Sequence, residues 1–175
     1  MKRSELGKLP EYFDRYILEC DDVSVSTAIQ CSIEELNQYS TETWQRLGPL
    51  SYAEGKWSVK DINQHLIDTE RIFSYRALAF ARGEAHALPS YDENQYALDA
   101  NANARSMASL LAELKATHHS LAALYESFSE SMLRRVGQGF KGPYSVADIG
   151  FILPGHQRWH FRVIEERYVP LLKTE

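Results

Sequence analysis

Apolar side chains recur every three or four positions along most of this sequence, which is the spacing of one face of an α-helix. Only 9 glycines and 6 prolines interrupt the 175 residues, and no segment shows the sustained alternation of a half-buried strand. A chain of this pattern must build its core by packing helices against one another. The sequence therefore predicts an all-α fold.

Capping and stop signals divide this pattern into four long helices. The first ends where Gly48 and Pro49 follow, and its apolar stripe reaches Tyr39. Pro170 ends the last. The predicted helices cover about Ser24–Leu47, Ser58–Gly83, Ser106–Phe128 and Ser145–Tyr168.

Two connectors separate the later helices. The segment Gly83–Arg105 is rich in Asn and Asp, which predicts an irregular crossover or a lid over a site. The segment "SESMLRRVGQGFKGPY" holds three glycines and a proline and is read as a loop. With a hydrophobic content of 44%, the chain is expected to form a single domain over residues 1–175, a four-helix bundle with one long crossover.

Charge and cysteine content narrow the classes of partner and compartment. The formal net charge of -5 leaves no basic face for phosphates, so nucleic acid is not an expected partner. Cys20 and Cys31 do not form a disulfide framework, which favours a reducing compartment. No apolar run suits a signal peptide or a membrane span, and a cytoplasmic protein is expected.

Two of the helices open with nearly the same cap, "WSVKDI" from Trp57 and "YSVADI" from Tyr144. His65 lies seven residues after the first capping serine, whereas His156 and His160 lie eleven and fifteen residues after the second. These offsets differ by steps of four, so the histidines occupy closely related helical faces. If the two helices face each other, all three imidazoles can point into one place.

These histidines have two interpretations. Each lies among apolar neighbours and could be an ordinary core histidine with a hydrogen-bond partner. Alternatively, three neutral imidazoles would hold a divalent ion such as Zn²⁺ or Ni²⁺ and leave positions open for water or substrate. Pro154 predicts either a kink just before His156 or a late start of the helix.

Several other residues have candidate roles. Asp68, one turn after His65, could orient that histidine or act as an additional metal ligand, and the alternative is an ordinary exposed acid. Glu70 is expected to pair with a surface charge, and Trp57 to anchor the core rather than stack on a substrate. Histidines 86, 118 and 119 are expected to be solvated. Three residues of the crossover have two possible roles, substrate contact on the one hand and turn formation or packing on the other: Tyr91, Asp92 and Tyr96.

Four stretches together resemble the DinB-like superfamily, in particular its YfiT-type metal-dependent hydrolases: "GKWSVKDINQHLIDTERIFSYRALAFARGE", "LPSYDENQYA", "NARSMASLL" and "GHQRWHFRVIEERY". The resemblance extends from about Pro10 to Tyr168. It implies a four-helix bundle in up-down-down-up order, with His65, His156 and His160 as ligands of zinc or nickel. The family often has a small residue where this chain has Pro154, which bears on the local helix geometry.

The resemblance also implies a function. Members with an assigned activity use low-molecular-weight thiols such as bacillithiol or mycothiol for transfer or isomerisation, and many form homodimers. The first hypothesis is therefore a metal-dependent hydrolase or thiol S-transferase acting on a small molecule. The alternatives are a non-catalytic metal- or ligand-binding bundle related to stress, and a helical bundle without metal.

Overall fold

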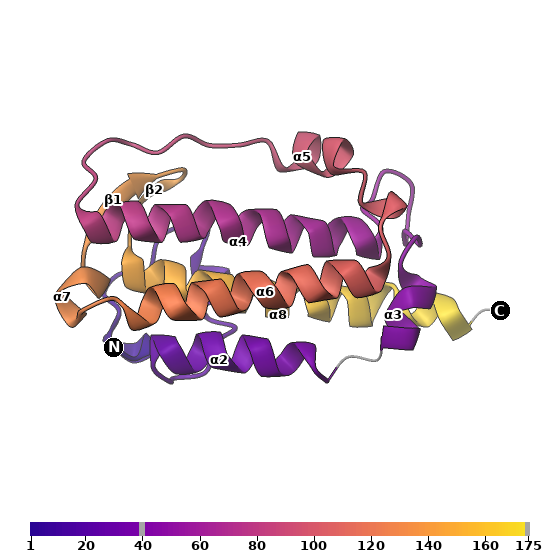
Figure 1. Ribbon diagram of the computed structural model, residues 1–175, viewed down its shortest axis with the longest axis horizontal. Coiled ribbons are helices and arrows are strands. Elements are labelled where there is room, and N and C mark those ends of the chain that lie inside the picture. Colours follow the sequence, from indigo (N-terminus) through magenta and orange to yellow (C-terminus); the bar gives the residue numbers. More distant parts are fainter. Residues whose placement is uncertain (39–40, 174–175) are drawn as a thin grey trace.

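In the computed structural model, which describes residues 1–38 and 41–173, four long helices lie side by side (Figure 1). Helices α2 and α8 run in one direction and α4 and α6 in the other, which confirms the up-down-down-up order. Both α4 and α2 pack against α6 and α8. The long helices are α2 (Val25–Leu36), α4 (Val59–Arg82), α6 (Met107–Glu126) and α8 (Val146–Arg167).

The predicted caps set most of these bounds. Ser58 and Ser145 each accept from the backbone N–H three residues on, while Asp61 and Asp148 accept from the two serine N–H groups in return. Gly83 ends α4 in the left-handed region, with φ 87°. The predictions for the second, third and fourth helices are thus confirmed within a few residues.

The prediction of one helix over Ser24–Leu47 is wrong. The chain forms two helices there, α2 and α3 (Thr41–Leu47). Helix α2 ends because the N–H of Asn37 bonds to the carbonyl of Glu34, three residues back, which tightens the last turn and stops the α-helical ladder. Tyr39 lies outside the described residues.

The crossover is more regular than predicted. It contains α5 (Glu93–Ala100) and the 3-10 turn η2 (Ala102–Ala104), and it runs back along the outside of the bundle (Figure 1). Asp92 begins α5 by accepting from the N–H groups of Asn94 and Gln95. The helix buries none of its residues, so it has no apolar stripe that a periodicity argument could detect.

The second connector also holds structure that the sequence reading missed. After α7 (Glu130–Leu133), strands β1 (Val136–Gly139) and β2 (Gly142–Ser145) form an antiparallel hairpin, pairing Val136 with Ser145 and Gly139 with Gly142. A side chain at position 137 would collide with the ring of Phe80, so its glycine lets the hairpin lie against α4. Apart from this small sheet, the all-α prediction is confirmed.

The remaining elements are short: η1 (Arg3–Glu5), α1 (Asp14–Ile17) and η3 (Val169–Lys173). None of the described helices is long and apolar enough to cross a membrane.

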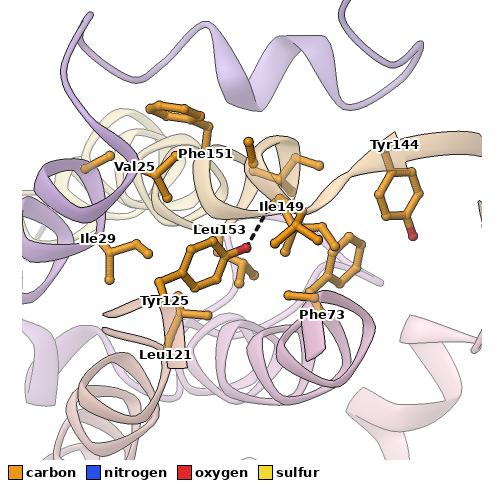
Figure 2. Packing of buried hydrophobic residues seen from close by; sticks show 14 of the residues in the cluster. Val25, Ile29, Phe73, Leu121, Tyr125, Tyr144, Ile149, Phe151 and Leu153 are labelled. Carbon is orange, nitrogen blue, oxygen red and sulfur yellow. Dashed lines mark hydrogen bonds between the residues drawn. The ribbon is translucent and has the colours of Figure 1, made fainter. Parts of the chain in front are cut away.

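The buried apolar residues form two clusters, one towards each end of the bundle. Figure 2 shows the first, in which Tyr125 of α6 reaches α8 and its hydroxyl donates to the Val146 carbonyl at 2.8 Å. The second gathers around Trp44, Leu66 and Phe161. Between the clusters, each long helix contributes buried polar side chains: Ser32, His65, Thr69, Glu70, His118, His156 and Gln157.

Helix α8 is continuous through Pro154, so the alternative of a late helix start is wrong. The next residue, Gly155, faces the backbone of α1, and a Cβ at this position would overlap the Tyr16 carbonyl. Glycine therefore permits α1 to pack directly on α8 beside His156.

We expect Gly155→Ala to lower the free energy of unfolding by about 1–3 kcal/mol or more, because the backbone of α1 must move away from α8. Chemical denaturation monitored by circular dichroism measures this change. Gly7→Ala is the matched control, since nothing lies within 4 Å of a Cβ there. Equal stability of the two variants would contradict the close packing at position 155.

Candidate metal centre

Three imidazoles meet in the polar layer of the bundle. His65 comes from α4, and His156 and His160 come from successive turns of α8. Nε2 of His156 lies 3.1 Å from Nε2 of His65 and 3.0 Å from Nε2 of His160. All three ligand atoms lie within 4.8 Å of one another. The structure thus places the three predicted histidines in one cluster, the histidine triad.

Aromatic side chains surround the triad. The ring centroid of Tyr16 lies 4.9 Å from that of His156, and that of Trp57 lies 4.7 Å from that of His65. Tyr16 also packs edge-on against Trp159 at 5.8 Å. Trp57, expected only as a core anchor, therefore covers a triad histidine as well.

Burial keeps the triad neutral. It lowers the pKa of His65 to about 3, with a further contribution from His160, and lowers the pKa of His160 to about 4. Burial, together with the proximity of His160, His65 and the Arg15 cation, holds the pKa of His156 well below its usual range. Neutral imidazoles present lone pairs, which is the form that binds a metal ion.

The donor set fits a divalent transition metal. Two nitrogen ligands bound at 2.0–2.1 Å stand roughly 2.8–3.4 Å apart for bond angles between 90° and tetrahedral. The two short Nε2 separations, 3.1 and 3.0 Å, match this spacing. Imidazole nitrogen suits zinc, nickel and copper, and three protein ligands leave at least one position open.

Two cavities border the triad. The larger, about 420 Å³, is lined by His65 and His156, while a second cavity of about 250 Å³ is lined by His160. Tyr16 lines the larger cavity and Trp159 the second, and the two rings pack edge-on against each other. The histidine triad therefore borders both cavities.

Residues 24–164 match the family model of the DinB superfamily. The chain belongs to the DinB superfamily. The recognition of a DinB-like protein from the sequence is thereby confirmed.

Two solved structures share the fold of this DinB-superfamily chain. YfiT from Bacillus subtilis, described as a probable metal-dependent hydrolase with an unusual four-helix bundle topology, is 18% identical, with a TM-score of 0.61 over 87% of this chain and 83% of its own. A mycothiol-dependent maleylpyruvate isomerase is 11% identical, with a TM-score of 0.61 over 91% of this chain. The match spans only 61% of the isomerase chain. No curated protein gives a significant sequence match.

The three crossover residues predicted to contact a substrate lie at different distances from the histidine triad. Tyr91 and Asp92 line the larger cavity, and the Tyr91 hydroxyl lies 2.8 Å from Oγ1 of Thr69. Burial raises the pKa of Tyr91, so the hydroxyl keeps its proton. Tyr96 stands outside this cavity and packs its ring 5.1 Å from that of Tyr91. Asp92 has the turn-forming role too, as the cap of α5.

Asp68 accepts a hydrogen bond from Nε2 of Gln64 at 3.0 Å, and burial raises its pKa. On the same helix, Oγ1 of Thr69 lies 3.5 Å from Nδ1 of His65. Thr69 thus links His65 to Tyr91. The sequence pattern did not predict this link. That Asp68 orients His65 stays a prediction.

The expected solvation of His118 and the expected surface pairing of Glu70 are both wrong. Both are buried, and His118 bonds to Glu70 through Nδ1 and to Gln157 through Nε2. Burial alone would lower the pKa of His118, but the Glu70 carboxylate and these hydrogen bonds raise it. His118 lies within the apolar stripe of α6 and Glu70 within that of α4, and these positions would have predicted that both residues are buried. His86 and His119 are exposed, as expected.

The lowered pKa values of the triad predict acid sensitivity of the metal-free protein. An unfolded histidine binds a proton near pH 6.5, whereas folded His65 and His160 resist it down to about 3 and 4. Stability is therefore full above pH 6.5 and falls as the pH drops towards these folded values, by up to about 2 kcal/mol per histidine at pH 5. Urea denaturation at pH 7 and 5 measures this loss.

Replacing His65 by glutamine should reduce the pH-dependent loss, because glutamine does not titrate. His119→Gln serves as the control, since this histidine is exposed. An unchanged difference between pH 7 and pH 5 in His65→Gln would contradict the prediction.

Proposed function

We propose that this chain is a metal-dependent transferase that joins or exchanges groups between two small molecules. His65, His156 and His160 would bind one zinc or nickel ion. The observation that carries the proposal is that the triad borders two cavities at once. A hydrolase needs room for one organic substrate and water, whereas a transferase needs room for two organic molecules.

The bound ion would supply Lewis acidity, which lowers the pKa of a water or thiol at its open position. A low-molecular-weight thiol is our candidate for one substrate. The described dependence of the structurally similar isomerase on mycothiol supports this choice. Zinc and nickel both remain candidates, because imidazole ligands suit either.

The protein residues would bind and cover the two molecules. The first turn of α5 lies over both hollows, since Asp92 and Glu93 line the larger cavity and Asn94 lines the second. The Tyr91 hydroxyl, held by Thr69, is available to donate to a substrate oxygen in the larger cavity. The crossover would thereby exclude bulk water from the reacting groups.

Hydrolysis is the second candidate, favoured by the shared fold with YfiT, a probable metal-dependent hydrolase. In that reaction, water would take the place of the thiol at the open position. The expected homodimer, the cytoplasmic location and the single domain over residues 1–175 stay predictions.

Metal content tests the ligands directly. Protein purified without a histidine tag should carry about one divalent ion per chain by elemental analysis, and His160→Ala should lose most of it, because two imidazoles bind far more weakly than three. His119→Ala should keep the ion, since His119 is exposed. Equally low metal in wild type and His160→Ala would show that the triad is not a metal site.

Turnover separates the candidate functions. Metal-loaded protein should consume an electrophile only when a low-molecular-weight thiol is present. The rate should saturate as the concentration of either substrate, the electrophile or the thiol, is raised. Asn94→Trp should raise KM for one of the two about tenfold, because its side chain would enter the second cavity. Gln95→Trp, on the same helix but outside both cavities, is the control.

Three results would contradict a transferase. Equal ester hydrolysis with and without thiol would indicate a hydrolase. Absence of turnover across thiol and ester panels at full metal loading would favour a non-catalytic binding protein. A parallel rise of both KM values in Asn94→Trp would mean that the second cavity does not hold a separate substrate.

A further inference from the structure

Arg76 of α4 is a buried cation without an anionic partner. Its side chain is 2% exposed, and none of the ion pairs among the described residues includes it. Nη1 donates to the Tyr144 hydroxyl at 3.3 Å, and Nη2 donates to the Pro89 carbonyl at 2.9 Å. The guanidinium also lies 4.6 Å from the ring centroid of Phe73. These neutral partners leave its positive charge uncompensated.

Other arginines of the bundle show the usual arrangement. Arg71 and Arg105 pair with Glu113, and Arg158 pairs with Glu35. These three are more exposed than Arg76, so pairing matters less for them. A guanidinium is always protonated, and burying it without a counter-charge is costly. Such a residue is retained most readily where a ligand supplies the missing anion.

Arg76 also lines the larger cavity, together with His65 and His156. Eleven residues separate Arg76 from His65 on one helix, so both lie on the same face, about 16 Å apart along the axis. Thr69 and Phe73 lie between them and line the same cavity. The cavity therefore runs along α4 from the triad to the guanidinium.

The cavity walls favour a flat, apolar body between these two ends. Aromatic rings from four segments of the chain line it: Tyr12, Phe13, Tyr16, Phe73, Tyr91 and Phe140. The acids that line it, Asp92 and Glu93, are exposed, whereas Arg76 is buried. A ligand matched to this hollow would be apolar along most of its length and anionic at one end.

We propose that the larger cavity binds a small molecule with an aromatic or extended apolar body and a carboxylate, and that Arg76 binds the carboxylate. The reacting group of that molecule would then face the triad, about three helical turns away. The proposal rests on the proposed function for the identity of the site, and it names Arg76 as its specificity-determining residue. Carboxylate binding itself requires no turnover.

The test compares 3-phenylpropionate with 3-phenylpropionamide, which has a similar shape and no charge. Isothermal titration of zinc-loaded, full-length protein should show at least about tenfold tighter binding of the carboxylate, as expected for charge-assisted hydrogen bonds. Arg76→Met should abolish this preference, while Arg71→Gln, which removes a charge from the same helix outside the cavity, should retain it. Equal binding of both probes by wild type would overturn the proposal.

The same titration of His160→Ala shows whether Arg76 or the metal ion binds the carboxylate. A preference that persists in His160→Ala and disappears in Arg76→Met supports the proposal, even if elemental analysis shows no metal in wild type. A preference that disappears in His160→Ala and survives in Arg76→Met overturns it and leaves the metal site intact. Thermal melting verifies that each variant is folded. If Arg76→Met does not fold, Arg76→Lys should weaken the preference severalfold, because lysine lacks the planar fork, and an unchanged preference there would overturn the proposal.

Discussion

A layer of buried polar side chains crosses all four long helices, and the arrangement of the bundle depends on satisfying it. Glu70, His118 and Gln157 form a chain that ends at the Ser32 carbonyl, so α4, α6, α8 and α2 are linked in turn. Because the Gln157 amide nitrogen donates to Ser32, its oxygen faces His118, which must donate to it. A shift of any helix along its axis would leave a buried polar group unpaired, which costs more than moving an apolar contact. The layer thus fixes the register of the helices.

This register also aligns the triad. His156 directly precedes Gln157 on α8, and His65 lies just over one turn before Glu70 on α4, so the two helices that hold the triad are also joined through the polar layer. Apolar clusters alone tolerate sliding, since one leucine can replace another as a neighbour. The triad requires finer alignment, because Nε2 of His156 lies about 3 Å from the Nε2 atoms of both His65 and His160, and directional hydrogen bonds supply that alignment.

The sequence predicted those parts of the fold that local signals specify. The caps at Ser58 and Ser145 fixed two helix starts, and their shared spacing predicted that His65, His156 and His160 would meet. Features set by tertiary contacts escaped it. Helix α5 buries nothing, and the hairpin depends on contacts such as that of Gly137 with Phe80. His118 was expected to be solvated like its neighbour His119, although its position in the apolar stripe of α6 points it inward.

The crossover connects the two ends of the larger cavity. Thr69, beside His65, holds the Tyr91 hydroxyl, and Arg76, three turns after His65, holds the Pro89 carbonyl. Thr69 and Arg76 therefore each hold the crossover and also line the cavity. A carboxylate bound at Arg76 would share the five N–H donors of the guanidinium with the Pro89 carbonyl, and a substrate oxygen near Tyr91 would compete with Thr69. Ligand binding and the position of the crossover must consequently be coupled, because they share the same hydrogen-bonding groups.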